Sequence, residues 1–517
     1  MKYVIILFLV LLLIVSSVSF VSANGASLNR APTPVNVEDV PGTWYLGAEP
    51  LEVDESKSPI VFVQGLHGNA RDWWEETVYY GENDMYDYFY SNGYRTAFVQ
   101  LEDATGGDAA DMWDNGQLLA NMLKEIHDHF EEKVNIVSHS KGGVDTQSAL
   151  IHYEAWPYVD DVITLSAPHY GTPTADLAYS WWANWLADLI GQTDDGTYSM
   201  QVGEMEKFRL LTDNHENALK NTYYTASGTG WGPIFSALWF GGAYLWEDSD
   251  GLVPVSSTQL PYGVHFLSGG DDVNHDNIRM GYISFESMDL LLSNLNSFSS
   301  PSFSTSEVNI ESTYVPEQLL RGNTLPINQS ISEVIPVESG NNQVSFQILT
   351  SGEHVDVSLT SPKGKQFTKK SKQFKSSDAN HIIKGSYSQT FVIDQPDSGN
   401  WTITMNSSKE DAFLIITNFE GSNALDIQWS QLEDEANKKP NKENDKSKDE
   451  KDKSKKVKKL KIDKKIKINK RKHHNKSLKP EIINTINSES INVTYEIVGT
   501  TEDGEVFYRT AVKSYFE

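Results

Sequence analysis

Short apolar runs alternate with segments of helical periodicity from Asn24 to about Ser300. In Asp114–Phe130, for example, apolar residues recur at the spacing of one helix face. Apolar strands separated by helices are typical of a mostly parallel sheet that is covered on both faces, so this region predicts an α/β domain over residues 24–300. The predicted strands are Pro59–Gln64, Arg95–Gln100, Val134–Ser138, Asp161–Ser166, Thr222–Ser227 and Val264–Gly269.

Residues 301–434 have a different pattern, in which the helical periodicity disappears. Runs such as NQVSFQIL, SQTFVID and AFLIITNF are separated by Gly, Ser, Asp, Pro and Lys. Short strand-like runs between turn residues are typical of two packed antiparallel sheets. The second predicted domain is therefore an all-β sandwich, an accessory domain over residues 301–434.

The segment that follows is rich in Lys and poor in apolar residues. Residues 437–480 contain 20 Lys and Arg against 6 Asp and Glu, whereas the whole chain has a formal net charge of −28. Because this composition buries too little apolar surface to fold alone, residues 435–480 are predicted to be a disordered linker. The alternative interpretation is electrostatic retention on anionic cell-surface polymers. The acidic remainder of the chain argues against nucleic-acid binding.

The last residues, 481–517, contain strand-like runs on either side of the sequence EDGE, which is a turn signal. They predict a short β-rich C-terminal segment. Two arrangements are open: a hairpin that returns to the sandwich, or a small unit of its own.

The first 23 residues have the pattern of an export signal. Lys2 precedes the apolar run VIILFLVLLLIV, and the small-residue sequence VSA lies before Asn24. A membrane anchor is disfavoured because the run is shorter than the ~20 residues of a spanning helix. The chain contains no Cys, which excludes disulfides, thiolate nucleophiles and thiolate metal ligands. A signal peptide over residues 1–23 predicts a secreted, extracellular protein, with cell-wall association as a further possibility.

The sequence NIVSHSKGGVD, from Asn135 to Asp145, contains two candidate nucleophiles. A serine on the sharp turn between a buried strand and a helix has strained backbone angles and a side chain that projects above the sheet. The turn brings together the positions two before and two after that serine, so both must be small. Ser140 has Ser138 and Gly142 there, whereas Ser138 would have the bulky Ile136. Ser140 is therefore the predicted nucleophile.

An earlier strand is followed by a glycine-containing loop in VFVQGLHGNARDWW. In α/β folds with a serine elbow, such a loop supplies one backbone N–H to the oxyanion hole, and the residue after the nucleophile supplies the other. The predicted donors are Leu66 and Lys141.

The acid and the base are expected late in the chain. Asp250 lies on the glycine turn of EDSDGLVPVSS, with Asp248 as a neighbour that could substitute for it. His275 follows the last predicted strand, whereas His265 lies inside that strand. The order Ser140, Asp250, His275 is the order of the α/β-hydrolases. His127 and His129 are expected on the polar face of a helix.

At these positions the chain resembles the secreted bacterial lipases of the α/β-hydrolase superfamily, over about Pro41 to Leu295. The segments that carry the resemblance are VSHSKGG, SAPHYGTP, YYTASGT, SDGLVPVSS and VNHDN. It implies Ser140, Asp250 and His275 as the catalytic triad and Leu66 and Lys141 as the oxyanion positions. In the accessory domain, QPDSGNWTITM resembles the closing strand of a P-domain type of sandwich.

Two positions depart from the family pattern. Gln64 precedes Gly65 where these lipases usually have His. Many of them also bind a structural calcium through an Asp two residues after the catalytic histidine, where this chain has Asn277, with Asp276 one residue earlier. The chemistry itself requires no cofactor, and a structural calcium remains an open alternative.

The region Leu177–Gly191 predicts a helix that carries Trp181 and Trp185 on one face. We expect an aromatic cap over the serine that contacts lipid. The predicted function is a secreted serine carboxylic ester hydrolase, a triacylglycerol lipase that forms an acyl-enzyme. The alternatives are an extracellular polyester depolymerase or an amidase of the same fold, or a non-catalytic surface-binding protein.

Overall fold

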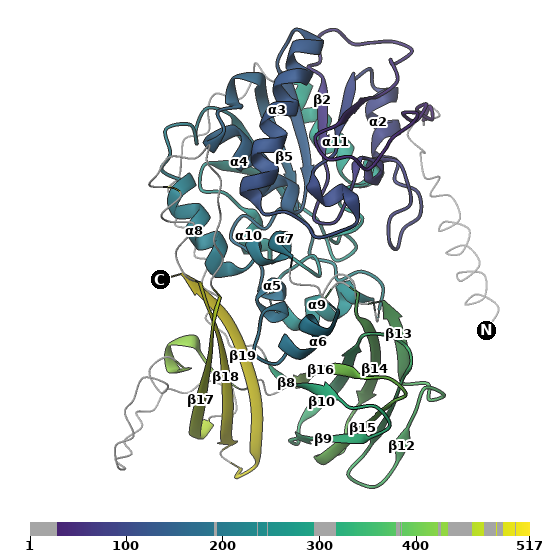
Figure 1. Ribbon diagram of the computed structural model, residues 1–517, viewed down its shortest axis with the longest axis vertical. Helices are drawn as coiled ribbons and strands as arrows, with labels where there is room; N and C mark the ends of the chain where they lie inside the picture. Colours follow the sequence, from purple (N-terminus) through teal and green to yellow (C-terminus); the bar gives the residue numbers. More distant parts are fainter. Residues whose placement is uncertain are drawn as a thin grey trace, which may run out of the picture.

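The computed structural model describes most of the chain after residue 27 (Figure 1). The predicted signal peptide, residues 1–23, lies outside the described residues. So does the predicted linker on either side of residues 457–469. The described residues are 28–190, 194–234, 236–245, 247–293, 317–378, 383, 385–421, 425, 427–432, 457–469, 482, 490–501 and 503–516.

The predicted α/β domain is confirmed, and its strands form a mostly parallel sheet in the order β1-β3-β2-β4-β5-β6-β7. Only the edge strand β1 is antiparallel to its neighbour within this sheet. Strands β2 to β5 are almost fully buried, as expected of short apolar runs covered on both faces. Their bounds are β1 Trp44–Leu46, β2 Ile60–Val63, β3 Thr96–Val99, β4 Val134–His139, β5 Val159–Leu165, β6 Thr222–Ser227 and β7 Gly263–Ser268.

Helices cover both faces of this sheet. The apolar side chains of α3 and α4 pack on one face, and those of α2 and α11 pack on the other (Figure 1). Helix α3 begins after Asp111, whose carboxylate accepts the backbone N–H groups of Trp113 and Asp114. The bounds are α2 Met85–Ser91, α3 Met112–Phe130, α4 Lys141–His152 and α11 Gly281–Ser293, with short helical turns at η1 Ala70–Trp73, η2 Glu102–Thr105 and η3 Trp156–Tyr158.

Smaller helices lie between β5 and β7, at the end of the sheet where its parallel strands finish. They are α5 Pro173–Ala178, α6 Asn184–Ile190, α7 Asp195–Ser199, α8 Val202–Thr212, α9 Ala237–Leu245 and α10 Val255–Thr258. The single helix predicted over Leu177–Gly191 is wrong, because α5 ends at Ala178 and α6 begins only at Asn184. None of the helices in the described residues is both long enough and apolar enough to cross a membrane.

The accessory domain is a β-sandwich, as predicted. One sheet has the order β13-β14-β10-β16-β8 and the other β12-β11-β15-β9, and both are antiparallel. Their inner faces bury Trp401 beside Phe346 and Phe367. The bounds are β8 Gln318–Leu325, β9 Ser330–Val337, β10 Asn341–Thr350, β11 Val355–Thr360, β12 Gln366–Phe367, β13 Phe374–Asp378, β14 Tyr387–Asp394, β15 Gly399–Ser407 and β16 Asp411–Gly421.

The C-terminal residues form a separate antiparallel sheet in the order β17-β18-β19. Its strands are β17 Val457–Asn469, β18 Ser490–Thr501 and β19 Val506–Phe516, and Gly504 has the positive φ of +86° that the predicted turn requires. The prediction of a disordered linker over residues 435–480 is therefore wrong for residues 457–469. In that stretch apolar residues alternate with lysines, and β18 supplies the hydrogen-bonding partner that the isolated segment lacks.

Both β units pack against the small helices of the α/β domain (Figure 1). Leu177 and Leu186 of the helices share one apolar core with Leu414 and Ile416 of the sandwich and Val512 of β19. Polar bonds fix the C-terminal sheet in the same place, because the buried Asp176 carboxylate accepts the Ser514 N–H at 3.1 Å and the Ser514 hydroxyl at 2.6 Å. The small helices are thus covered by the sandwich and by the C-terminal sheet, the two accessory units.

Candidate active site

Ser140 lies on a sharp turn between β4 and α4. Its backbone has φ +53° and ψ −133°, a conformation that costs strain for a residue with a side chain. The positions on either side need small residues, as the sequence indicated. A Cβ on Gly142 would lie 2.2 Å from the Gln64 carbonyl oxygen, and Ser138 is fully buried with its hydroxyl donating to the Ile163 carbonyl at 3.0 Å. This turn has the geometry of a nucleophile elbow.

The structure brings Ser140, His275 and Asp250 together in one line of hydrogen bonds. The Ser140 Oγ lies 3.0 Å from His275 Nε2, and His275 Nδ1 lies 2.8 Å from Asp250 Oδ2. The His275 N–H also donates to the Asp250 carbonyl at 2.9 Å, which fixes the two loops against each other. An imidazole held in this way can accept a proton from the serine while the carboxylate stabilises the resulting cation.

The two alternative residues considered from the sequence do not take part in this line. Asp248 is exposed, whereas Asp250 is fully buried and its Oδ1 accepts the N–H groups of Leu252 and Val253 at 3.0 and 2.7 Å. His265 lies within β7, where its ring bonds hydroxyl groups of neighbouring residues and burial lowers its pKa.

The loop after β2 lies against the elbow. A Cβ on Gly65 would meet the Ser140 Cβ at 3.0 Å, so this glycine permits the close approach. The N–H of Lys141 is the first of its helix and has no acceptor within that helix. Among the described residues, neither this N–H nor that of Leu66 donates to a protein acceptor. Both are therefore available to an oxyanion beside Ser140.

Gln64 replaces the family's histidine without leaving a buried polar group unpaired. With its amide oxygen toward the Leu101 N–H at 2.7 Å, its nitrogen donates to the Val99 carbonyl at 2.9 Å. The side chain is 1% exposed, so these two bonds offset its loss of water. Gln64 thus joins the loop after β2 to the end of β3.

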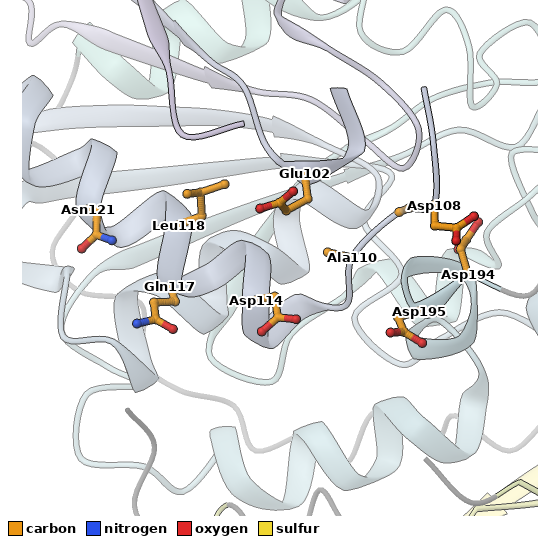
Figure 2. A pocket seen from close by; sticks show the side chains of 10 residues that line it. Glu102, Asp108, Ala110, Asp114, Gln117, Leu118, Asn121, Asp194 and Asp195 are labelled. Carbon is orange, nitrogen blue, oxygen red and sulfur yellow. The ribbon is translucent and has the colours of Figure 1, made fainter. Parts of the chain in front are cut away.

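The loop after β2 contacts one wall residue of an acidic pocket of about 540 Å³ (Figure 2). His67 Nε2 lies 3.3 Å from Asp194, a residue at the start of α7 that lines this pocket. Burial, together with the nearby Asp114 and Asp103, raises the pKa of Glu102 in its wall. Figure 2 shows the pocket between the start of α3 and α7, with its carboxylates on both sides; they belong to Glu102, Asp108, Asp114, Asp194 and Asp195.

The residues after His275 do not fit a calcium site. The Asp276 carboxylate is held by Arg279 at 3.1 Å and by the N–H groups of Val78 and Tyr79 at 3.2 and 2.8 Å. These donors occupy the oxygens that a cation would need. Throughout the described residues, no group of three or more His, Asp or Glu side chains is arranged to hold a metal.

The two tryptophans of the predicted lipid-contacting cap lie against the accessory units, and Trp181 is 40% exposed. Trp181 precedes α6, and its N–H donates to Thr494 of the C-terminal sheet at 3.2 Å. Trp185 packs against the core that the small helices share with the sandwich. The spacing of four residues correctly indicated that this face makes apolar contacts. These contacts are provided by the accessory units, which are distant in sequence.

One group of residues at the site was not found from the sequence. The Lys141 side chain points inward and lies in a buried polar cluster with Asp103, Asn115 and Asp145. Spacing could indicate the Lys141–Asp145 pair, because the two residues are one helical turn apart. Nothing in the local pattern indicates that Asp103 and Asn115 complete the cluster.

The chain is similar in sequence and fold to known proteins. Residues 54–180 match the family described as the PGAP1-like alpha/beta domain. The Bacillus licheniformis lipase BlEst2, solved in its propeptide form, is 32% identical over 92% of this chain and 100% of its own, with a TM-score of 0.73. The mature form of BlEst2 is 45% identical over 49% of this chain and 99% of its own, with a TM-score of 0.44. No curated protein matches the chain.

Proposed function

Because the chain belongs to the α/β-hydrolase family of the lipase BlEst2, a family of serine hydrolases that act on lipid and other esters, we propose that it is a triacylglycerol lipase whose nucleophile is Ser140. The observation that carries the proposal is the unbroken line from the Ser140 hydroxyl through His275 to the buried Asp250. Every member of this line has the residue type that its role requires.

The geometry supports an acyl-enzyme mechanism. His275 Nε2 takes the Ser140 proton as Oγ attacks the ester carbonyl carbon, and the carbonyl oxygen becomes an anion bound by the N–H groups of Leu66 and Lys141. When this intermediate collapses, the C–O bond to the alcohol breaks and His275 gives its proton to the leaving oxygen. Water then repeats the two steps on the acyl-enzyme and releases the carboxylic acid.

These steps use protein groups alone. Asp250 keeps the histidine in the tautomer with a proton on Nδ1, so that Nε2 is free to accept the serine proton. The two backbone donors stabilise charge where it develops, and each such donor contributes roughly 3–4 kcal/mol in comparable hydrolases. A metal enters none of these steps.

The experiment that tests this function compares p-nitrophenyl esters of short and long acyl chains with a p-nitroanilide of the same acyl group. We expect ester hydrolysis, with long chains and emulsified triacylglycerol accepted, and little anilide hydrolysis. A ratio that favours the anilide would make the protein an amidase. Activity on aliphatic polyester films without activity on triacylglycerol would make it a depolymerase. A folded protein that cleaves none of these substrates would contradict the proposed function.

We further propose that the protein is exported and retained at the cell surface by its Lys-rich segment. The full-length likeness to a lipase solved in its propeptide form supports export as a precursor. Lys461 and Lys464 are exposed on β17, so part of the positive charge is presented on a folded edge. The remaining lysines of residues 437–480 add to the attraction toward anionic polymers.

Cell fractionation tests both parts of this proposal. We expect the protein outside the membrane, bound to cells at low salt and released at high salt, because salt screens the attraction between exposed charges. Replacing Lys451, Lys453, Lys455 and Lys456 by Gln should shift the release to lower salt while leaving β17–β19 unaltered. An intracellular protein would contradict export, and association that is independent of salt and of these lysines would contradict retention.

A further inference from the structure

The residue that follows the nucleophile has a buried charged side chain. The Lys141 Nζ lies 3.0 and 2.9 Å from the two Asp145 oxygens and 3.7 Å from Asp103 Oδ2. The Asn115 amide bridges the two carboxylates, at 2.5 Å from Asp103 Oδ2 and 3.0 Å from Asp145 Oδ2. The side chains of Lys141, Asp103 and Asp145 are each at most 2% exposed, so the cluster is closed to water.

Such a cluster is costly to bury. Burial alone would lower the pKa of the Lys141 ammonium, but Asp103 and Asp145 raise it above its ordinary value. Burial raises the pKa of Asp145, and Lys141 opposes that shift. Buried ion pairs often stabilise a protein less than apolar residues of the same volume would. The cluster lies between the elbow and the loop after β2, so a role in joining these two parts of the site would explain why the charges are buried.

Asp103 extends the cluster to the oxyanion loop. Its Oδ1 accepts the N–H of His67 at 3.2 Å. His67 has a φ of +57°, and the Gly68 N–H donates to the Gly65 carbonyl at 3.0 Å, so Leu66 and His67 are the two central residues of one tight turn. An acceptor at this point holds the strained turn in one orientation. The two predicted oxyanion donors are therefore joined by side chains: from Lys141 through Asp103 to the residue after Leu66.

We propose that Asp103 is a positioning residue that aligns the Leu66 N–H with the Lys141 N–H, and that the Lys141 ammonium and the Asn115 amide hold Asp103 in place for this purpose. The inference rests on the proposed function, because it assigns a role within the same oxyanion hole. Lys141 then serves twice: its backbone binds the oxyanion, and its side chain holds the carboxylate that orients the other donor. A hole prepared before the reaction needs no reorganisation as charge develops.

The chain contains a matched control for this role. Asp145 is equally buried and bonds the same Lys141 and Asn115 groups. In the described part of the chain, however, the loop N–H of His67 is bonded by Asp103 and not by Asp145. If the cluster is merely structural, replacing either carboxylate should have the same effect on catalysis. If Asp103 positions the donor, its replacement should lower kcat much more than replacement of Asp145.

The experiment measures kcat and KM for a soluble ester, and the affinity for an alkyl boronic acid that forms a tetrahedral adduct with the serine, in wild type, Asp103→Ala and Asp145→Ala. For Asp103→Ala we expect kcat to fall about 10- to 100-fold with KM little changed. The oxyanion forms only in the transition state, so a misplaced donor weakens the binding of the transition state and leaves the binding of the ester nearly unchanged. Boronic acid affinity should fall by a similar factor. Asp145→Ala should lose thermal stability to a similar extent but retain much more of both kcat and boronic acid affinity.

Equal losses of kcat in the two variants, or unchanged boronic acid binding by Asp103→Ala, would overturn the inference. If Asp103→Ala does not fold, Asp103→Asn and Asp145→Asn provide the same comparison, because an amide keeps the shape but cannot accept from His67 and from Lys141 and Asn115 together. A wild-type protein that is folded but hydrolyses no ester and binds no boronic acid would instead contradict the proposed function, so the two failures are distinguishable.

Discussion

Replacing Ser140 by Ala is expected to lower kcat for ester hydrolysis by about 10⁶-fold, the scale seen when the nucleophile of a serine hydrolase is removed. The change removes the attacking oxygen, and the Ser140 Oγ to His275 Nε2 bond of 3.0 Å disappears with it. Residual catalysis by the oxyanion donors alone should remain above the uncatalysed rate. Single-turnover hydrolysis of a p-nitrophenyl ester measures the effect, and labelling by a fluorophosphonate should be lost in parallel.

Ser138→Ala is the matched control for this prediction. Ser138 is two residues earlier, is fully buried and donates its hydroxyl to the Ile163 carbonyl at 3.0 Å. Its loss should cost roughly 0.5–1.5 kcal/mol of stability, since the substitution removes one buried hydrogen bond, and should leave the chemistry in place. Activity that survives in Ser140→Ala and disappears in a folded Ser138→Ala would contradict the assignment of the elbow.

Asp250→Asn is expected to lower kcat by about 10⁴-fold, because the substitution imposes the wrong histidine tautomer. The Oδ1 of Asp250 accepts the N–H groups of Leu252 and Val253. An amide at this position must keep its oxygen toward these donors, so its NH₂ group faces His275 Nδ1. The ring then carries its proton on Nε2, where it cannot accept the proton of Ser140. The measurement is the rate of acylation by a p-nitrophenyl ester.

The corresponding control is Asp248→Asn, at the acidic residue that the sequence alone could not separate from Asp250. Asp248 is exposed, so this change should leave kcat close to the wild-type value. Unfolding measurements on both variants distinguish a catalytic loss from a folding defect. The assignment would be wrong if Asp248→Asn abolished activity and Asp250→Asn did not.

Local sequence predicted the nucleophile and the order of the triad, but not the residues distant in sequence that contact them. The small residues on either side of Ser140 identified the elbow, since a sharp turn accepts little else. The steric reason appears in the distance of 2.2 Å between a Cβ on Gly142 and the Gln64 carbonyl oxygen. The order of serine, acid and histidine then followed from the order of the strands, whose ends meet at one edge of a parallel sheet.

The predictions that were wrong have one physical cause, which is partners distant in sequence. The lysine-rich stretch of β17 cannot fold alone, but it pairs with β18 along its whole length. The face that carries Trp185 is apolar as expected, yet it packs against a core that the sandwich completes, about 230 residues later in the chain at Leu414 and Ile416. Periodicity reports that a surface is buried and says nothing of what buries it.

The sequence by itself therefore determined the α/β sheet, the sandwich and the elbow serine, because these depend on residue spacing and on backbone sterics within a few residues. Tertiary structure decided the choice of Asp250 over Asp248, the inward direction of the Lys141 side chain and its link through Asp103 to the oxyanion loop. It also packed the small helices against the accessory units. These features depend on the desolvation and pairing of groups that meet only when the chain is folded, and no local pattern encodes them.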